Sequence, residues 1–81
     1  MTRFACPCCG FLTLDEEPPG TFLICKVCFW EDDMTQFRNP DSTGGANAVS
    51  LNAARQSYRE HGVSELRFAA HVRPPRPDEL P

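Results

Sequence analysis

Two short apolar runs stand near the start of the chain and are separated by turn-forming residues. Residues 11–14 read FLTL and residues 21–24 read TFLI, while residues 15–20 between them read DEEPPG. Proline cannot donate to a strand ladder and glycine accepts a positive φ, so the middle segment has the composition of a loop. The pattern predicts a β-hairpin in which the two runs pair across this long loop.

Apolar residues recur at helical spacing in one later segment. They are Leu51, Ala54 and Tyr58, at positions i, i+3 and i+7. This spacing places them on one face of a helix, which is predicted to span about residues 51–61. Asn47 or Ser50 can accept hydrogen bonds from its first free amides, and Gly62 suits the position that follows its last turn.

Two single helical turns are also expected. Asp33 stands three residues before Gln36, the spacing of an N-cap and its partner, and Asn39-Pro40 would end that turn. Ser64, which is followed by an acidic residue, is predicted to start another helical turn that runs through residue 68. The intervening residues 41–45 (DSTGG) are expected to form a loop.

The chain is short enough that packing alone is a weak source of stability. With 81 residues, it buries about 60% of the surface that its unfolded form exposes. Packing then contributes about 3 to 5 kcal/mol, so disulfides, a metal ion or a partner subunit must add to it. Five cysteines could supply disulfides or a metal site. No apolar leader precedes them, and an odd number would leave one thiol unpaired after secretion, so a reduced, cytoplasmic protein with a metal site is expected.

The spacing of the cysteines is the strongest signal in the sequence. Residues 6–10 read CPCCG and residues 25–28 read CKVC. Two residues between cysteines let a tight turn aim both sulfurs at one point, and zinc takes four such ligands in a tetrahedron. Pro7 presets φ in the first turn and Gly10 permits a positive φ at its end. The predicted ligands of one structural Zn²⁺ ion are Cys6, Cys9, Cys25 and Cys28.

Cys8 is left over by this spacing. It is too close to Cys6 for a two-residue turn, and its side chain should point away from that of adjacent Cys9. It is either a small, partly buried thiol or a spare thiolate made reactive by a nearby cation or metal. We favour the first interpretation, because a thiol becomes a nucleophile only in special surroundings.

Two other metal chemistries were weighed against structural zinc. Rubredoxin-like iron uses the same four thiolates for one-electron transfer, but Cys28 is followed by Phe29 where a small residue is expected in an iron redox turn. Catalytic zinc keeps one position open for water, whereas four cysteines fill every position. The protein is therefore expected to bind structural zinc, to have no enzyme activity and to bind no small-molecule substrate.

An aromatic pair joined to an acidic run follows the last cysteine. These residues are Phe29, Trp30, Glu31, Asp32 and Asp33. In the favoured interpretation, one or both rings cover the metal cluster and fill the core, while the acids cap a turn and stay solvated. In the alternative, the segment is an exposed partner-binding patch with an aromatic anchor and a charged rim. The segment is therefore a candidate binding site for another protein.

Charge argues against nucleic acid as the first choice of partner. Residues 1–37 carry two basic and six acidic side chains, residues 38–81 carry six basic and five acidic ones, and the net charge is −3. Nucleic-acid binding begins with the neutralisation of phosphates, so it is the runner-up function. The arginines that would serve it are Arg55, Arg59, Arg67, Arg73 and Arg76.

Three remaining features suggest no further site. Residues 44–47 (GGAN) could present amides to an anion, but they lack a phosphate-binding lysine and are expected to form a flexible turn with an N-cap. His61 and His71 are too badly spaced for a second zinc site. No apolar run approaches the roughly 18 residues that cross a bilayer, so no membrane partner is expected.

Several motifs point to a known family. They are residues 6–10 (CPCCG), 16–20 (EEPPG), 24–33 (ICKVCFWEDD), 44–47 (GGAN), 50–52 (SLN) and 71–77 (HVRPPRP). With these motifs the chain closely resembles the bacterial CPCC family of cysteine-rich proteins over nearly its whole length. The resemblance implies no established activity and carries over no catalytic residue.

The predicted fold is a small α+β metal-binding domain. It combines a zinc-ribbon or rubredoxin-like hairpin over residues 4–30, two cysteine knuckles and one packed helix in a single domain, residues 1–72. Residues 73–81, rich in proline and arginine, form an extended C-terminal arm. The leading hypothesis is a zinc-stabilised adaptor that binds another protein through the aromatic–acidic face, the arm or both. A nucleic-acid-binding zinc ribbon and an iron electron carrier are the alternatives.

Overall fold

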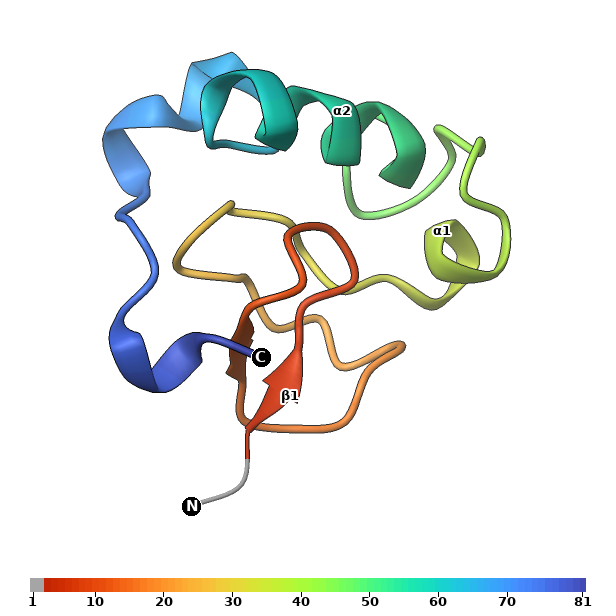
Figure 1. The fold of residues 1–81 in the computed structure, drawn as a ribbon. Helices are drawn as coiled ribbons and strands as arrows, with labels where there is room; N and C mark the ends of the chain where they lie inside the picture. Colours follow the sequence, from red (N-terminus) through yellow and green to blue (C-terminus); the bar gives the residue numbers. More distant parts are fainter. Residues whose placement is uncertain (1–2) are drawn as a thin grey trace.

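The computed structural model of the protein describes residues 3–81. Its two-stranded antiparallel sheet pairs β1 (Phe4–Ala5) with β2 (Leu12–Leu14), in the register Phe4 to Leu14 and Ala5 to Leu12 (Figure 1). The residues between these strands are those of the first cysteine turn. The sheet is therefore a small hairpin that has the first cysteine turn at its tip.

The long hairpin predicted between residues 11–14 and 21–24 is wrong. The second run instead folds back on the segment that follows the second cysteine turn, where Ile24 forms an antiparallel bridge with Glu31. The neighbouring amide of Asp32 donates to the carbonyl of Leu23 over 2.9 Å. Each cysteine turn already reverses the chain, so its two flanks meet with less loss of loop entropy than segments joined by the longer loop.

The expected short turn after the acidic run is the helix α1 (Met34–Arg38). Asp33 is its N-cap, and its Oδ2 accepts a hydrogen bond from the amide of Gln36 over 2.9 Å. Asn39 ends the helix, directly before a proline that disfavours further helical backbone. The prediction of this turn is confirmed.

The helix α2 (Leu51–His61) has the predicted bounds. Ser50, not Asn47, is the N-cap, and its Oγ accepts from the amide of Ala53 over 3.1 Å. Gly62 follows with a left-handed φ of 75°, and its amide donates to the carbonyl of Tyr58. These local signals were sufficient to define both ends of the helix.

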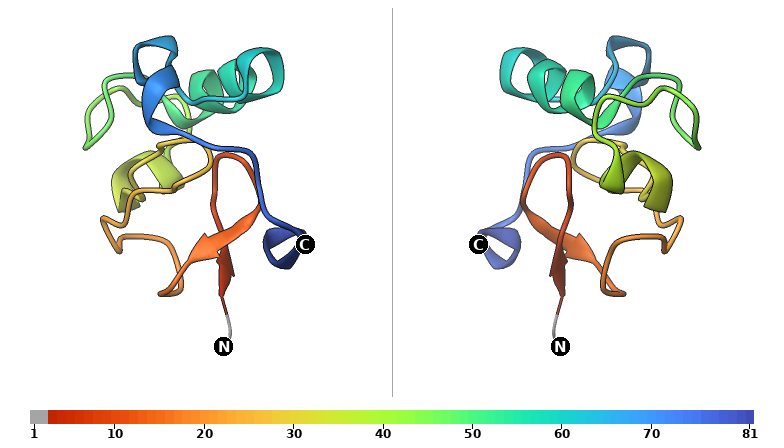
Figure 2. Two further views of the ribbon diagram at one scale, coloured as in Figure 1. Left: turned by 90° about the vertical axis from the view of Figure 1, so that its left-hand side faces the viewer. Right: turned by 90° about the vertical axis from the view of Figure 1, so that its right-hand side faces the viewer.

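The C-terminal third wraps around the domain and does not project from it. The 3₁₀ helix η1 (Leu66–His71) begins two residues later than the expected turn at Ser64. A second 3₁₀ helix near the C-terminus, η2 (Pro77–Glu79), contacts β2 (Figure 2). Glu79 is only 1% exposed. The prediction of an extended arm is therefore wrong for the last residues, because a buried carboxylate attaches them to the domain.

An ion-pair cluster accounts for this attachment. Arg73 donates to both carboxylate oxygens of Glu79 over 2.7 Å, and the amide of Arg76 donates to Oε1 over 2.8 Å. Arg3, next to β1, pairs with Asp78 and, through its Nη1, with the Oε2 of Glu79 over 3.6 Å, and these two pairs attach the segment to the domain. The prolines keep the intervening backbone extended, and the two-pronged pairing closes the segment on itself.

The hydrophobic core includes cysteines from both turns. Its buried members are Cys6, Cys8, Cys25, Val27, Cys28, Trp30, Leu51 and Ala54. They come from the two cysteine turns and from one face of α2, which lies across both turns (Figure 1). Within residues 3–81, none of the helices has the length and hydrophobicity of a membrane-spanning segment.

Candidate metal centre

The two cysteine turns, residues 6–11 and residues 25–30, have matching backbones. In each, the amide of the first cysteine donates to the carbonyl of the sixth residue over 2.9 Å. The amide of the fifth residue donates to the carbonyl of the first cysteine over 2.8 Å. That fifth residue has a left-handed backbone in both turns, with φ 82° at Gly10 and φ 70° at Phe29. One local conformation therefore presents both pairs of cysteines.

The structure brings four sulfur atoms to one point. The Sγ atoms of Cys6, Cys9, Cys25 and Cys28 all lie within 4.8 Å of one another. Two of the distances between the turns are 3.6 Å, from Cys6 to Cys28, and 3.7 Å, from Cys9 to Cys25. A metal ion about 2.3 Å from each corner of a sulfur tetrahedron sets the corners about 3.8 Å apart. The four cysteines could therefore hold one metal ion.

The electrostatics of the four thiols also fit a cation. The pKa of Cys25 is lowered, chiefly because Cys28, and then Cys6 and Cys9, donate hydrogen bonds to its sulfur. The pKa values of the three donors, Cys6, Cys9 and Cys28, are raised, chiefly by their hydrogen bonds with Cys25. One sulfur can thus carry negative charge while its neighbours keep their protons. All four become thiolates together only if a cation neutralises them.

A hydroxyl that the sequence analysis did not single out contacts this group. Thr13, in the middle of β2, places its Oγ1 3.0 Å from the Sγ of Cys25. The amide of Cys8 donates to the Sγ of Cys6 over a longer 3.4 Å. The alternation of leucine and threonine along β2 puts Thr13 on a different face from its neighbours, but nothing local shows what that face meets.

Cys8 lies outside the group of four sulfurs. It is the third residue of the first turn, where the second turn has Val27, and the two side chains are 9% and 1% exposed. Both belong to the hydrophobic core. The structure therefore places Cys8 where its counterpart in the second turn is a plain apolar residue.

Three of the five residues of the predicted partner-binding patch are buried. Trp30 is 1% exposed and belongs to the core, and Asp32 and Asp33 are also buried. Asp33 caps α1, while the Oδ2 of Asp32 accepts from the amide and the hydroxyl of Thr21 over 2.9 and 2.7 Å. The exposed interpretation is therefore wrong for Trp30, Asp32 and Asp33, because the two carboxylates accept hydrogen bonds within the domain.

The other two members of that segment are partly exposed. The ring of Phe29 lies 4.6 Å from that of Phe68 and 5.4 Å from the imidazole of His71, centroid to centroid. The backbone of Glu31 is held on both sides by Asn47, which accepts from its amide over 3.0 Å and donates to its carbonyl over 2.8 Å. His71 thus packs on an aromatic ring, and Asn47 links a loop to the second turn.

Residues 44–47 wrap around a buried glutamine and are not arranged as an anion site. Gln36 is fully buried, and its Nε2 donates to the carbonyls of Ser42, Asn47 and Val49. A Cβ added at Gly45 would lie 2.7 Å from atoms of Gln36 and Asp33, so only glycine fits there. This close approach explains why the second residue of the Gly44-Gly45 pair is a glycine.

Three of the five arginines named for nucleic-acid binding are engaged within the chain. Arg55 donates from Nε to the carbonyl of Pro7 in the first turn over 2.9 Å. Arg67 pairs with Glu65 over 2.9 Å, and Arg73 pairs with Glu79. Two of these arginines are therefore paired with acidic side chains, which reduces their attraction for phosphates.

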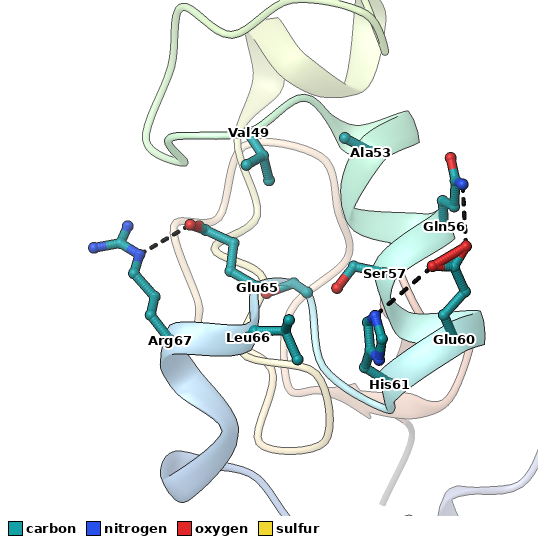
Figure 3. A pocket seen from close by; sticks show the side chains of 10 residues that line it. Val49, Ala53, Gln56, Ser57, Glu60, His61, Glu65, Leu66 and Arg67 are labelled. Atoms are coloured by element: carbon teal, nitrogen blue, oxygen red, sulfur yellow. Dashed lines mark hydrogen bonds and ion pairs between the residues drawn. The ribbon is translucent and has the colours of Figure 1, made fainter.

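A groove of about 490 Å³ lies between α2 and η1 (Figure 3). Val49, Ala53 and Leu66 give it apolar walls, and the ion pair of Arg67 with Glu65 stands at one edge. His61 points toward Glu60 at the opposite side, 3.7 Å away. No cysteine lines this groove, so it is separate from the candidate metal centre.

Comparison with known proteins identifies the family. A family model described as cysteine-rich CPCC matches residues 4–79, and the chain belongs to that family. No curated protein matched the chain. The match includes both cysteine turns, α1, α2 and the C-terminal segment through Glu79.

Proposed function

We propose that this member of the cysteine-rich CPCC family binds one structural Zn²⁺ ion through Cys6, Cys9, Cys25 and Cys28, and that the domain folded around it binds another protein. The observation that carries the metal proposal is the meeting of four sulfurs, presented by two matching turns, within 4.8 Å of one another. Such a set of thiolates is typical of closed structural zinc sites.

Zinc is favoured over iron by the surroundings of the second turn. The bulky ring of Phe29 stands directly after Cys28, where an iron redox turn is expected to have a small residue. Zinc also fits the energetic need of the chain, because its binding contributes about 10 to 16 kcal/mol to the folding of small metal domains. An undersized core built around cysteines gains most from such an ion.

A structural role is favoured over a catalytic one by the ligand set. Four cysteines fill a tetrahedron and leave no position for water or substrate. Cys6, Cys25 and Cys28 are also buried, so the ion would lie against the core. The chemistry that such an ion supplies is neutralisation of the thiolates and cross-linking of the two turns.

The proposed partner-binding role rests on side chains that folding leaves outside the core. Among the described residues, Phe22 and Leu66 are the most exposed large apolar side chains, at 62% and 63%. They replace the aromatic–acidic segment as the candidate contacts, because Trp30 belongs to the interior. The ion pairs of Arg67 and Arg73 weigh against nucleic acid as the partner.

Metal analysis tests the first half of the proposal. Protein purified under reducing conditions should carry one zinc and no iron per chain. Chelation should change its circular dichroism spectrum to that of an unfolded chain, and restored zinc should recover the spectrum of the folded protein. Cys28→Ser should lose the metal, while the matched Cys8→Ala variant should keep it. Iron in native material, or an unchanged spectrum after verified metal loss, would contradict the proposal.

Affinity capture from native cells tests the second half. The zinc-loaded wild type should retain a defined protein after a wash at high salt, and a variant with Phe22→Ser and Leu66→Ser should lose it while keeping one zinc. Captured nucleic acid that is released by salt would favour the alternative function. Equal capture by both proteins would show that these two side chains are not the contact surface.

A further inference from the structure

Thr13 occupies the side of β2 that faces the second cysteine turn. It stands between Leu12 and Leu14, and Leu14 is buried. Since successive side chains of a strand point to opposite faces, the side chain of Thr13 lies on the face opposite to that of the two leucines. There its Oγ1 lies 3.0 Å from the Sγ of Cys25. The contact joins the hairpin of the first cysteine turn to a sulfur of the second.

The direction of this hydrogen bond follows from the chemistry of a metal ligand. A thiolate bound to a cation has no proton, so the threonine hydroxyl must donate and the sulfur must accept. A donor to an ionised acceptor makes a stronger bond than a neutral pair. Among the described residues, this is the shorter of the two hydrogen bonds that groups other than the four cysteines donate to their sulfurs.

We propose that Thr13 is a positioning residue of the metal centre, whose hydroxyl orients the Cys25 thiolate and withdraws electron density from its sulfur. The inference rests on the proposed metal binding and adds a residue that determines how tightly the ion is held. Groups that hydrogen-bond to metal ligands typically change metal affinity about 10- to 100-fold when they are removed. Loss of the Thr13 hydroxyl is expected to weaken binding at the lower end of that range.

A simpler role would be that of a strand residue with a suitable shape. Threonine and valine are both β-branched, and both favour strands. Thr13→Val therefore preserves the shape and the strand preference while it removes the donor. Thr13→Ser keeps the donor but removes the methyl group. The two variants separate the hydrogen bond from packing.

The experiment compares the wild type with these two variants and with Thr43→Val, which makes the same chemical change at an exposed loop residue. Each protein is titrated with zinc in competition with a chromophoric chelator. Each is then loaded with Co²⁺, whose sulfur-to-metal charge-transfer band reports the electron density on the thiolates. Thr13→Val should bind zinc about 10-fold more weakly, and its band should move to longer wavelength. Thr13→Ser and Thr43→Val should match the wild type in both measurements.

The outcomes separate this inference from the proposed function. A wild type that binds neither zinc nor cobalt would refute metal binding itself. A wild type that binds, with Thr13→Val unchanged in affinity and in cobalt spectrum, would overturn only the role of Thr13. A band shift in Thr13→Ser as large as in Thr13→Val would assign the effect to the methyl group and would also overturn it. If Thr13→Val does not fold with metal, a wild-type spectrum for Thr13→Ser supports the role and a shifted one refutes it.

Discussion

The two cysteine turns have the same backbone but very different surroundings. The first turn, residues 6–11, has Gly10 at its left-handed position and leaves Cys9 half-buried. The second turn, residues 25–30, has Phe29 at that position, and both of its cysteines are fully buried. The hydrogen bonds within each turn define its shape, and the contacts that stabilise this shape from other segments differ between the two turns.

The left-handed residue shows this difference most directly. Glycine adopts such a backbone without steric cost, whereas another residue loses about 1 to 2 kcal/mol. Phe29 accepts that cost because its ring packs on Phe68 and His71 of η1. The first turn therefore depends on local freedom, and the second on a tertiary contact.

The attachments of the two turns differ in the same way. The carbonyl of Pro7 in the first turn accepts one hydrogen bond from the side chain of Arg55 on α2. In the second turn, the carbonyl of Cys28 accepts from the amide of Ser64 over 2.8 Å, and that of Lys26 from the amide of Arg73 over 3.3 Å. The C-terminal third thus holds the second turn by its backbone.

The largest difference is expected at the sixth residue of each turn. Trp30 is buried in the core, whereas Phe11 is partly exposed and packs on Tyr58 with ring centroids 6.2 Å apart. Trp30→Ala should cost about 3 to 5 kcal/mol of unfolding free energy, and Phe11→Ala clearly less. Guanidinium unfolding of the zinc-loaded proteins, followed by circular dichroism at fixed free zinc, measures both. Equal losses would show that the two turns contribute equally to the core.

The next effect concerns the tail that reaches the second turn. Glu79→Gln removes the charge that Arg73 pairs with, and should cost about 1.5 to 3 kcal/mol at neutral pH. Glu60→Gln, at an exposed pair on α2, is the matched control and should stay within about 0.5 kcal/mol of the wild type. A loss no larger than that of the control would show that the ion pairs of Glu79 do not stabilise the domain.

The same residue predicts a pH dependence. The pKa of Glu79 is lowered from 4.5 to about 2, chiefly because Arg73 donates hydrogen bonds to its carboxylate. A lowered pKa stabilises the folded state fully above pH 4.5, and this contribution disappears as the pH falls toward 2. The stability difference between the wild type and Glu79→Gln should therefore shrink over that interval. Because both proteins keep the same cysteines, acid release of metal affects them alike.

A smaller effect is expected at the left-handed position. A Cβ added at Gly10 meets no atom within 4 Å, so Gly10→Ala should cost only the backbone penalty of about 1 to 2 kcal/mol. Phe29→Gly relieves that penalty but loses the ring contacts, and should still destabilise the protein by about 1 kcal/mol. A more stable Phe29→Gly variant would show that the ring does not offset the strain.

The smallest effect is expected at the third residue of the first turn. Cys8→Val places at this position the residue that the second turn has at Val27. It should change the unfolding free energy by less than about 1.5 kcal/mol and leave one metal ion per chain. Elemental analysis and denaturant unfolding measure the two quantities. Loss of the metal would mean that Cys8 takes part in the site.

Local signals predicted the elements that depend on neighbouring residues. Ser50 and Gly62 limit α2, and Asp33 begins α1, because a cap acts within one turn of backbone. The spacing of the cysteines likewise defined two turns, since a Cys-x₂-Cys segment reverses the chain by itself. These features needed no knowledge of what lay across the molecule.

Longer-range choices were missed for a common reason. The apolar runs were predicted to pair with each other, but each pairs across its own cysteine turn, where closure costs less entropy. The sequence favoured burial of the aromatic rings over an exposed patch, but it placed the neighbouring acids in solvent in either case, whereas Asp32 and Asp33 are buried. Their burial follows from the partners that other segments bring, such as Thr21 for Asp32.

By itself, the sequence determined two cysteine turns, two capped helices and four sulfurs at the spacing of a metal site. All of these follow from short-range geometry. Only the tertiary structure decided that Thr13 meets Cys25, that Gly45 makes room for Gln36 and that Glu79 pairs with Arg3 at the other end of the chain. Alternation and composition indicate which face a residue occupies, but the group that it meets there depends on how distant segments pack.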